Sequence, residues 1–523
     1  MKIALGQVNP LVGDLEGNVR RCRAAWLQAR SAGAELLVLP ELAMPGCPPR
    51  DILFDASFVQ AMQAAALDLA RQTQDGPPLL IGTVLPAGPA RAGHPNLYNA
   101  AALLIGGEVR LAAAKRLLRS QDVFHEPRWF APGPALPPLE VAGARLGVLF
   151  DADLEDEGRE LHPAAELAAA GAQLLVCLAA SPYSQAVYTR RLQAAARAPL
   201  PLLYANLAGA TDELIFDGRS FACLRSGELL ARAQAFREQV LTIDCSPFLP
   251  WLCQDKNGEH IKMAAPDAQD GLAELFAALV LGVADFFAKN RIERAFLGLS
   301  GGVDSALAAV IAARALGPQR VTAVAMPSRY SDPRSTACAR ELATALGIGF
   351  EVVELEPLHL AAEAALGDLL AQGSAAENLQ ARLRALILLG YVNRYGGLLL
   401  NTSNKTELSL GYGTVGGDLS GTLCPLGDLT KPDIYRLAHW VNTERPVIPE
   451  FILTRPPSAE LRPEQVDPFD YPALSPQLEQ LVQENRSNEA LRRAENKRWQ
   501  LGVVLRVTDK AFGSGRLIPI TRR

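Results

Sequence analysis

The residues best suited to chemistry in this sequence form one short run: Ser300, Gly301, Gly302, Val303, Asp304 and Ser305. An apolar stretch of strand length, 295–299, precedes the run, and a helical pattern begins at Val303 and ends before Gly317. A strand, a glycine turn and a helix N-terminus together aim free backbone N–H groups and a positive dipole end at one point. The run therefore predicts a phosphate site, and the carboxylate of Asp304 predicts Mg²⁺ beside the phosphate.

This run is neither of two common nucleotide motifs, because it lacks the lysine of a Walker A loop and the G-x-G-x-x-G pattern. Ser-Gly-Gly-Val-Asp-Ser instead resembles the pyrophosphate loop of the N-type ATP pyrophosphatases. The resemblance implies an enzyme that cleaves ATP between its α and β phosphates and adenylates a substrate. The alternative is a glycine turn that only tightens a strand-to-helix connection.

A second group of chemistry-bearing residues lies in the first half of the chain. Glu41 stands in Leu-Pro-Glu-Leu-Ala-Met-Pro-Gly, and Lys115 precedes Val-Phe-His-Glu-Pro-Arg-Trp-Phe at 123–130. With Ala-Ser-Pro-Tyr at 180–183 and Phe-Asp-Gly-Arg-Ser-Phe at 216–221, these segments resemble the nitrilase superfamily. The resemblance implies an α-β-β-α sandwich in which a cysteine thiolate attacks an amide, a glutamate deprotonates the thiol and a lysine stabilises the oxyanion.

The position of the nucleophile departs from that pattern. The resemblance places a cysteine after the predicted strand 145–150, where this sequence has Asp151 followed by Ala152. Gln121 and Val187 also stand where the resemblance implies a tyrosine and a basic residue. Since a carboxylate cannot form the thioester intermediate, we hypothesise that this half keeps its fold and has lost glutamine hydrolysis.

Glu41, Lys115 and Asp151 then form a charge cluster, and two carboxylates around one lysine raise the apparent pKa of one of them. Two other cysteines offer an alternative nucleophile. Cys47 lies in a Pro/Gly loop close to Glu41, and Cys177 lies within an apolar strand. A buried cysteine more often contributes packing than chemistry, so neither is favoured over the loss of hydrolysis.

Further motifs of the second half follow its predicted strands, open its long helix at 377 or lie near the end of the chain, and their residues are Met326, Asn378, Arg382, Thr402, Glu407, Asp418, Lys431 and Lys497. Together with the phosphate turn, this set resembles the NAD synthetases, and the nitrilase-like half in front makes the resemblance one to the two-domain, glutamine-dependent type. It implies ATP-dependent amidation of the nicotinate carboxylate of deamido-NAD, with release of AMP and pyrophosphate.

The resemblance also implies roles for these residues. Asp304 and Glu407 hold Mg²⁺, and Thr402 and Lys431 contact ATP, while the segment beginning at Met326 encloses adenine and ribose. Deamido-NAD faces three further side chains, those of Asn378, Arg382 and Lys497, and Asp418 lies near its nicotinate end. Each of these residues also has a purely structural interpretation. Arg382 and Arg384 could form a solvated helix face, Glu407 could cap a helix or form a salt bridge, and Lys497 could belong to a charged surface run.

The order of elements predicts an α/β protein of two domains. Strands are expected at 3–8, 35–39, 79–84, 101–105, 145–150, 173–178, 202–206, 295–299, 321–326, 350–355 and 397–402. Helices are expected at 15–31, 272–289, 303–316, 335–346 and 377–395. A nitrilase-like domain at 1–245, a polar linker at 246–271 and a doubly wound parallel sheet at 272–523 follow, the last of the N-type ATP pyrophosphatase class, which is adenine nucleotide alpha hydrolase-like.

Composition and charge indicate which classes of binding partner and environment are not expected. The net charge is −5 without a basic block, so no nucleic-acid partner is expected. Charged residues interrupt the apolar runs, so no membrane span is expected, and eight cysteines without a C-x-x-C pair argue against zinc and disulfides. We expect a cytoplasmic homo-oligomer.

Several functions remain open at this stage. The favoured one is synthesis of NAD from deamido-NAD, ATP and free ammonia. The second uses glutamine as the nitrogen donor, and the third is a standalone amidohydrolase. The nitrilase-like half could also serve as an oligomerisation scaffold. Another pyrophosphatase-type ligase, acting on a nucleotide or a tRNA, is the last alternative, and the lack of a basic surface disfavours tRNA.

Overall fold

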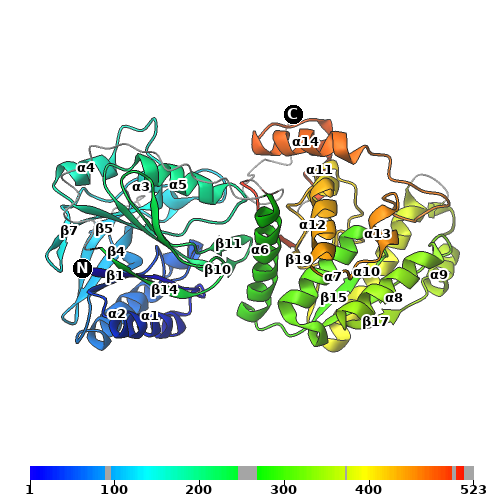
Figure 1. Cartoon of the computed structure of the whole chain (residues 1–523). Coiled ribbons are helices and arrows are strands. Elements are labelled where there is room, and N and C mark those ends of the chain that lie inside the picture. Colours follow the sequence, from blue (N-terminus) through cyan, green and yellow to red (C-terminus); the bar gives the residue numbers. More distant parts are fainter. Residues whose placement is uncertain (89–95, 246–267, 371–373, 498–501, 510, 512–523) are drawn as a thin grey trace. The chain divides into compact units, whose positions relative to one another are not determined.

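The chain forms two compact units in a computed structural model that describes residues 1–88, 96–245, 268–370, 374–497, 502–509 and 511 (Figure 1). Unit 1 comprises Met1–Thr211 and Ile215–Ala265, and unit 2 comprises Asp212–Leu214 and Pro266–Arg523. The predicted linker lies outside the described residues up to position 267, and residues 268–271 already belong to helix α6 (Ala268–Lys289).

Unit 1 contains two six-stranded sheets. The strands of the first, in spatial order, are β14 (Gln239–Asp244), β1 (Lys2–Gln7), β2 (Leu36–Val38), β3 (Leu79–Pro86), β4 (Leu97–Ile105) and β5 (Glu108–Ala114). Those of the second are β13 (Leu229–Arg232), β12 (Phe221–Cys223), β9 (Leu202–Asn206), β8 (Leu174–Ala179), β7 (Ala144–Phe150) and β6 (Leu139–Val141). A separate hairpin pairs β10 (Ala208–Thr211) with β11 (Leu214–Asp217).

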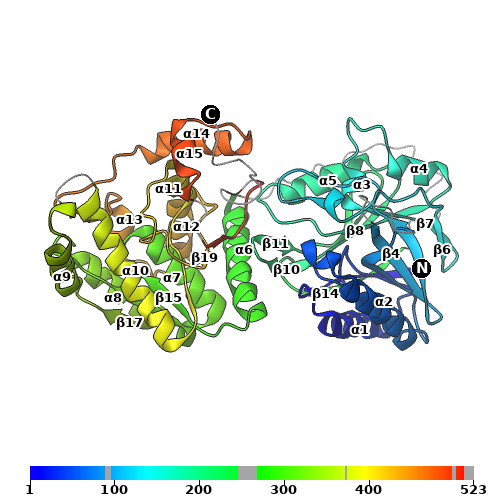
Figure 2. The same ribbon diagram turned by 180° about the vertical axis from the view of Figure 1, so that it is seen from behind.

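The core of unit 1 lies between the two sheets. Leu5 and Val38 from the first sheet pack in one buried cluster with Val148 and Val176 from the second. Helices α1 (Leu15–Ser31) and α2 (Ala56–Gln72) cover the first sheet, and Figure 2 shows them side by side. Helices α4 (Pro163–Ala169) and α5 (Val187–Arg197) cover the second sheet. The predicted α-β-β-α sandwich is confirmed.

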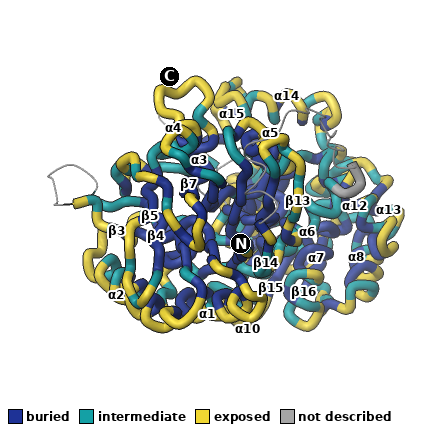
Figure 3. Tube along the Cα trace, turned by 60° about the vertical axis from the view of Figure 1, so that its left-hand side comes forward, coloured by how far each residue is buried: buried dark blue, intermediate teal, exposed yellow. Residues whose placement is uncertain are grey.

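Some helices and strands agree with the prediction from the sequence and others do not, and burial and strand pairing account for the difference. The central strands are buried on both faces, whereas α1 and α2 expose one side (Figure 3). Helix α1 spans the predicted range, because Asp14 caps it by accepting a hydrogen bond from the Gly17 amide at 2.9 Å. Helix α2 and strand β5 were not predicted. Strand β4 begins four residues before its predicted start, since antiparallel pairing with β3 extends it.

Unit 2 is built on four parallel strands in the order β17 (Gly349–Val352), β16 (Val321–Ala325), β15 (Ala295–Gly298) and β18 (Leu398–Leu399). Counted along the chain, this order is three-two-one-four, so the direction of winding reverses between β15 and β18. Ligands of such sheets bind at the carboxyl ends of the strands, where the winding reverses. The predicted doubly wound parallel sheet is confirmed.

Helices cover both faces of this sheet. One face carries α7 (Val303–Leu316) and α8 (Pro333–Leu346), and the other carries α9 (Glu356–Leu366) and α10 (Ala375–Tyr395), which lies nearest the viewer in Figure 2. The shorter helices after β18 are α11 (Lys405–Leu410), α12 (Lys431–Glu444), α13 (Glu450–Thr454), α14 (Tyr471–Gln483) and α15 (Glu489–Ala494).

A buried ion pair fastens the C-terminal segment to the site-bearing part of unit 2. Strand β19 (Leu423–Cys424) pairs with β20 (Val503–Val504). Asp428 then accepts hydrogen bonds from the amides of Val507, at 2.9 Å, and Thr508, at 2.6 Å. The same carboxylate lies 3.0 Å from the ammonium group of Lys405, the first residue of α11. This pair therefore links the C-terminal segment to the helix that carries Glu407.

One helix among the described residues, Gly271–Lys289 within α6, is long and apolar enough by length and composition to cross a membrane. One third of its most apolar window is buried, and α6 packs against α7 and α12. A core helix has the same composition, so this feature does not alter the expectation that no membrane span is present.

Replacing Asp428 with asparagine should destabilise unit 2 by about 1.5–3 kcal/mol, the value of hydrogen bonds to a charged group, because Asp428 binds the amides of Val507 and Thr508 while Glu479, at 2.7 Å, remains as a counter-charge for Lys405. Hydrogen exchange at the amides of Val507 and Thr508 should rise as well. Mass spectrometry of exchange in the full chain measures both. Glu489→Gln, at a surface pair with Arg493, is the control and should change neither. Equal exchange in the two variants would contradict the assigned role of Asp428.

Candidate active site

The glycine run forms a tight turn between β15 and the N-terminus of α7. Gly301 adopts φ +78°, and a Cβ atom there would lie 2.6 Å from the Ser335 carbonyl oxygen, so only glycine fits. The hydroxyl of Ser305 accepts a hydrogen bond from the Ser300 amide at 3.2 Å and donates to the Gly302 carbonyl at 3.1 Å. These contacts fix the turn at the end of the strand, with the start of the 14-residue helix beside it.

The turn opens into a cavity of about 520 Å³ at the reversal point of the sheet. That volume lies in the range of sites for small-molecule ligands. The predicted residues that line the cavity are Ser300, Gly302, Asp304, Ser305, Met326, Asn378, Thr402, Glu407, Asp418, Lys431 and Lys497. Gly301 and Arg382 are the predicted residues that do not line it. Tertiary folding thus brings together positions separated by nearly two hundred residues.

Lys431 lies between the two carboxylates predicted to hold a metal ion. Its ammonium group is 2.5 Å from Asp304 Oδ2 and 3.3 Å from Glu407 Oε1. Asn404 donates a further hydrogen bond to Asp304 at 2.9 Å. Burial, and then the neighbouring charge of Asp304, raise the pKa of Glu407 to about 7 although Lys431 opposes the shift.

This pair of carboxylates fits Mg²⁺. Mg²⁺ takes oxygen ligands and usually needs only one or two protein carboxylates, the rest being water and substrate phosphate. In the described part of the chain, no group of three or more His, Cys, Asp or Glu side chains has metal-binding geometry. A site completed by phosphate oxygens is therefore the type that Asp304 and Glu407 could form.

Helix caps place these side chains. Asn404 caps α11 by accepting from the Glu407 amide at 2.9 Å, and the Glu407 carboxylate reaches back to the Asn404 amide at 3.4 Å. Thr430 caps α12 in the same way through Asp433, which directs Lys431 from the first position of that helix. The alternative reading of Glu407 as a cap is thus correct, and Glu407 lines the cavity as well.

Hydrogen bonds fix the opposite part of the cavity lining. Asp418 accepts from the Thr414 amide at 2.7 Å, and the Thr414 hydroxyl donates to Asn378 at 2.8 Å. Burial raises the pKa of Asp418. Lys497 donates to the carbonyls of Gly411, at 2.7 Å, and Gly413, at 2.8 Å, so it is held against the cavity and does not belong to a solvated run.

Arg384 lines the cavity, whereas the side chain of Arg382 is exposed and donates to the Val415 carbonyl at 3.3 Å. Arg384 donates to the Met326 carbonyl at 3.2 Å and forms no ion pair among the described residues. Desolvation lowers the pKa of Arg384. A cation of this kind gains most from an anionic ligand, and the sequence could not separate two arginines one residue apart.

A proline-rich segment, 455–467, forms a wall of the cavity, and the sequence predicts an ordered loop over the site at 455–475. Arg455 donates to the Ser335 hydroxyl at 2.6 Å and to Glu460 at 2.7 Å. Ser335 is also the residue against which Gly301 packs. The segment therefore contacts the phosphate turn through a single serine, and the pattern Arg-Pro-Pro-Ser-Ala-Glu is the only signal the sequence offers for it.

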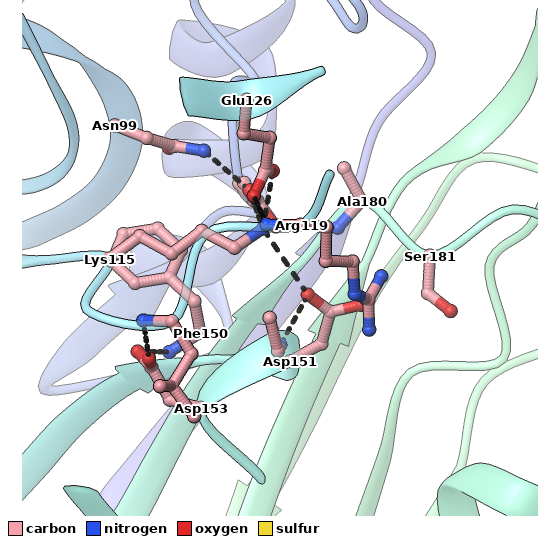
Figure 4. A network of polar contacts seen from close by, with 12 residues as sticks. Asn99, Lys115, Arg119, Glu126, Phe150, Asp151, Asp153, Ala180 and Ser181 are labelled. Atoms are coloured by element: carbon pink, nitrogen blue, oxygen red, sulfur yellow. Dashed lines mark hydrogen bonds and ion pairs between the residues drawn. The ribbon is translucent and has the colours of Figure 1, made fainter. Parts of the chain in front are cut away.

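Unit 1 holds a separate buried cluster at the carboxyl ends of its strands. Lys115 donates to Glu41 at 2.8 Å and to Glu126 at 2.6 Å, and Asn99 also donates to Glu41, at 2.6 Å. Figure 4 shows the lysine, Asn99 and Glu126 converging. The amide of Ala180 completes the set by donating to Glu41 at 3.2 Å. Glu126 and Asn99 were not predicted as site residues, although Glu126 lies in the stretch that carried the resemblance.

Asp151 enters this cluster from the first position of α3 (Asp151–Leu154), directly after β7. Its Oδ1 lies 3.8 Å from Lys115 Nζ and its Oδ2 lies 3.1 Å from Arg119 Nη1 (Figure 4). Burial opposes ionisation of Asp151, but these two cations hold its pKa below the ordinary value. The proton expected in such a cluster falls on Glu41, because burial and the charge of Asp151 raise its pKa to about 7.

Neither alternative cysteine has the properties of a nucleophile. Cys47 and Cys177 are buried, and burial raises the pKa of both thiols well above the ordinary value. Negative charge from Glu41 raises these pKa values further. A thiol must ionise to attack an amide, so both positions are chemically silent at neutral pH.

A sandwich with a glutamate and a lysine in its buried centre, joined in one chain to a doubly wound sheet with a phosphate turn, defines an enzyme of the carbon–nitrogen ligase class. The family description "carbon-nitrogen hydrolase" matches residues 2–247, and "NAD synthase" matches residues 275–511. The two matches cover the sandwich and the parallel sheet separately.

Full-length relatives carry the same combination. The chain is 37% identical to the glutamine-dependent NAD(+) synthetase of Synechocystis sp. over 99% of its length and 98% of the relative. It is also 37% identical to the glutamine-dependent NAD(+) synthetase of Rhodobacter capsulatus, over 100% of this chain and 98% of that relative. A solved glutamine-dependent NAD+ synthetase from Acinetobacter baumannii in complex with ADP superposes with a TM-score of 0.78 at 30% identity, over 99% of this chain and 98% of that one. The chain belongs to the glutamine-dependent NAD(+) synthetase family.

The raised pKa of Glu41 predicts a pH-dependent loss of stability. The unfolded pKa is near 4.5 and the folded one near 7, so between these values only the folded state keeps the proton. Stability therefore falls as the pH rises from about 4.5 to 7, by an amount of about 3 kcal/mol, and the loss stays constant above that window.

Glu41→Gln mimics the protonated acid and should remove this trend, so its stability relative to the unmodified chain should increase from pH 5 to pH 8. Chemical unfolding at several pH values, monitored in unit 1, measures the difference. The exposed pair partner Glu16 supplies the control, because Glu16→Gln should show no such trend. Parallel stability curves for Glu41→Gln and the unmodified chain would show that Glu41 is ionised in the fold.

Arg384→Met should raise the KM for ATP, deamido-NAD or both by roughly 10-fold to 100-fold, the value of a charge-assisted hydrogen bond of about 1.5–3 kcal/mol. It should leave the stability of the ligand-free chain unchanged or slightly higher, since an uncompensated cation is removed. Arg382→Met is the matched control and should alter KM less than about twofold, as expected for a surface change. Steady-state kinetics and thermal unfolding separate the outcomes, and larger effects from Arg382→Met would reverse the assignment.

Proposed function

We propose that this chain makes NAD from deamido-NAD, ATP and ammonia, through a nicotinyl-adenylate intermediate. The observation that carries the proposal is the convergence of the phosphate turn, the Asp304–Lys431–Glu407 cluster and Arg384 on one cavity. A carboxylate does not accept ammonia directly, because hydroxide is a poor leaving group. Adenylation supplies a good one, and an enzyme for this step must mainly position its substrates and stabilise negative charge.

In this proposal the turn from Ser300 to Ser305 receives the leaving pyrophosphate on its backbone N–H groups, next to the N-terminus of α7. Asp304 and Glu407 would hold Mg²⁺, which when bound spreads the charge of the phosphates. Lys431 and Thr402 contact ATP from the other strand end. No side-chain nucleophile is needed in unit 2, since ammonia attacks the adenylate carbonyl and AMP leaves.

Deamido-NAD occupies the part of the cavity lined by Asn378, Asp418 and Lys497 in this proposal. The linked hydrogen bonds through Thr414 keep Asn378 and Asp418 in fixed orientations before the substrate binds. Arg384 joins this group in place of Arg382, because it lines the cavity. Such preorganisation places the nicotinate carboxylate beside the α-phosphate of ATP without further rearrangement.

The nitrogen donor is the finer part of the proposal. Asp151 stands at the end of β7, where the nitrilase resemblance implies a nucleophilic cysteine, and burial disfavours Cys47 and Cys177 as substitutes. We therefore propose free ammonia as the donor and assign unit 1 a structural role, including that of an oligomerisation scaffold. The second candidate is glutamine, favoured by the names of the relatives and by the retained Glu41–Lys115 contact. A cytoplasmic location and a homo-oligomeric state stay predictions from the sequence.

The deciding experiment compares NAD formation by the purified full chain with ammonium and with glutamine at equal nitrogen. We expect turnover with ammonium and no glutamate release from glutamine, because the thioester step lacks its sulfur atom. Quantifying NAD, AMP and glutamate in the same reactions measures both halves of the proposal. Glutamate release that tracks NAD formation would establish glutamine as the donor, and an absence of AMP with either donor would overturn the adenylation step.

A further inference from the structure

Arg119 is the one feature of the unit 1 cluster that the proposed function leaves unexplained. It is buried, although it lies in a loop four residues after Lys115. Its guanidinium group lies 3.1 Å from Asp151 and 2.8 Å from Glu155, and it stacks over the ring of Phe124 at 5.2 Å. Burying a charged guanidinium group costs desolvation free energy unless ionised partners compensate for it.

Arg119 contributes positive charge to a buried cluster that has more carboxylates than ammonium groups. Three buried carboxylates, those of Glu41, Glu126 and Asp151, surround the single ammonium group of Lys115. Without a second cation the cluster would hold two unbalanced negative charges, a state that desolvation strongly disfavours. Arg119 supplies the second cation, and the proton retained by Glu41 balances the third carboxylate.

The position of Arg119 also matters. Each oxygen of Asp151 faces a cation, since Oδ1 faces Lys115 and Oδ2 faces Arg119. Oδ2 is buried and forms no directed hydrogen bond, so the 3.1 Å contact with Arg119 is an ion pair in close packing. An amide carbon must come within about 3–3.5 Å of a reacting atom at position 151, and the guanidinium group already fills space at that distance.

The backbone of Arg119 is anchored as firmly as its side chain. Its amide donates to Glu126 at 2.7 Å, and Glu126 in turn accepts from Lys115. Asp153 receives the amides of Arg116, at 3.1 Å, and Leu117, at 2.8 Å, which ties the same loop to the end of β7. The guanidinium group therefore cannot leave position 151 without disturbing several buried contacts.

We propose that Arg119 is a positioning residue that pairs with Asp151 and shields position 151, so that introducing a cysteine there does not by itself give access for an amide. This inference rests on the proposed loss of glutamine hydrolysis. It adds that the loss involves two coupled positions, 119 and 151, and that Arg119 is the residue to remove before a thiol at 151 can react.

The test uses Asp151→Cys in the full chain, alone and combined with Arg119→Ala or Arg116→Ala. Arg116 is the matched control, because it lies in the same loop but pairs with the partly exposed Glu166 at 2.5 Å. Iodoacetamide alkylation of the introduced thiol, localised by peptide mass spectrometry, reports access independently of catalysis. We expect alkylation to be roughly tenfold faster with Arg119→Ala than with Arg116→Ala, because the buried contact no longer has to open. Equal rates in the three variants would overturn the shielding role.

A double-mutant cycle tests the coupling without any new thiol. Arg119→Ala and Asp151→Asn should each lower the Tm, and the double variant should lose less than the sum, since neither charge is then left unpaired. Additive losses would overturn the coupling. Glutamate release by the unmodified chain would refute the proposed donor while leaving the alkylation comparison valid, so the two failures are distinguishable.

Discussion

The arrangement of unit 2 depends on one steric constraint, the close approach of the phosphate turn to helix α8. Gly301 lies against the Ser335 backbone with no room for a side chain, and Ser300 and Ser305 brace the turn from within. The turn must end β15 at the point where the sheet reverses its winding, because β18 delivers Thr402 to the same edge. The cavity exists because these two strand ends are neighbours in space.

Both units contain a buried cluster of charged side chains. In each, a buried lysine lies between carboxylates that come from distant parts of the chain: Lys115 contacts Glu41 and Glu126, and Lys431 contacts Asp304 and Glu407. In each, burial raises the pKa of one glutamate to about 7. The clusters differ in their surroundings, because the second lines a cavity of about 520 Å³, whereas in the first the guanidinium group of Arg119 lies 3.1 Å from Asp151.

This contrast bears on how the two halves of a fused enzyme can diverge. The phosphate turn and its cluster line the cavity of unit 2, whereas the first cluster has a carboxylate at the end of β7. A carboxylate in that buried place requires a compensating cation, and Arg119 lies 3.1 Å from it.

The sequence by itself determined the local events: the strand, turn and helix around Ser300, the range of α1, and the set of polar residues at strand ends. Periodicity and glycine placement report these features, since they depend on neighbours in the chain. It missed β5 and α2, whose formation depends on pairing or packing with distant segments. It also assigned Arg382 in place of Arg384, because facing a cavity is not a property of sequence distance.

The tertiary structure alone decided which charges meet. The sequence named Glu41, Lys115 and Asp151, but only folding showed that Glu126 and Arg119 join them and that the pKa of Glu41 is raised while that of Asp151 is lowered. A pKa is set by burial and by charges within a few ångströms, and neither quantity is written in the order of residues. The order of residues therefore determines which charged side chains the chain contains, while the fold determines their ionisation and their exposure.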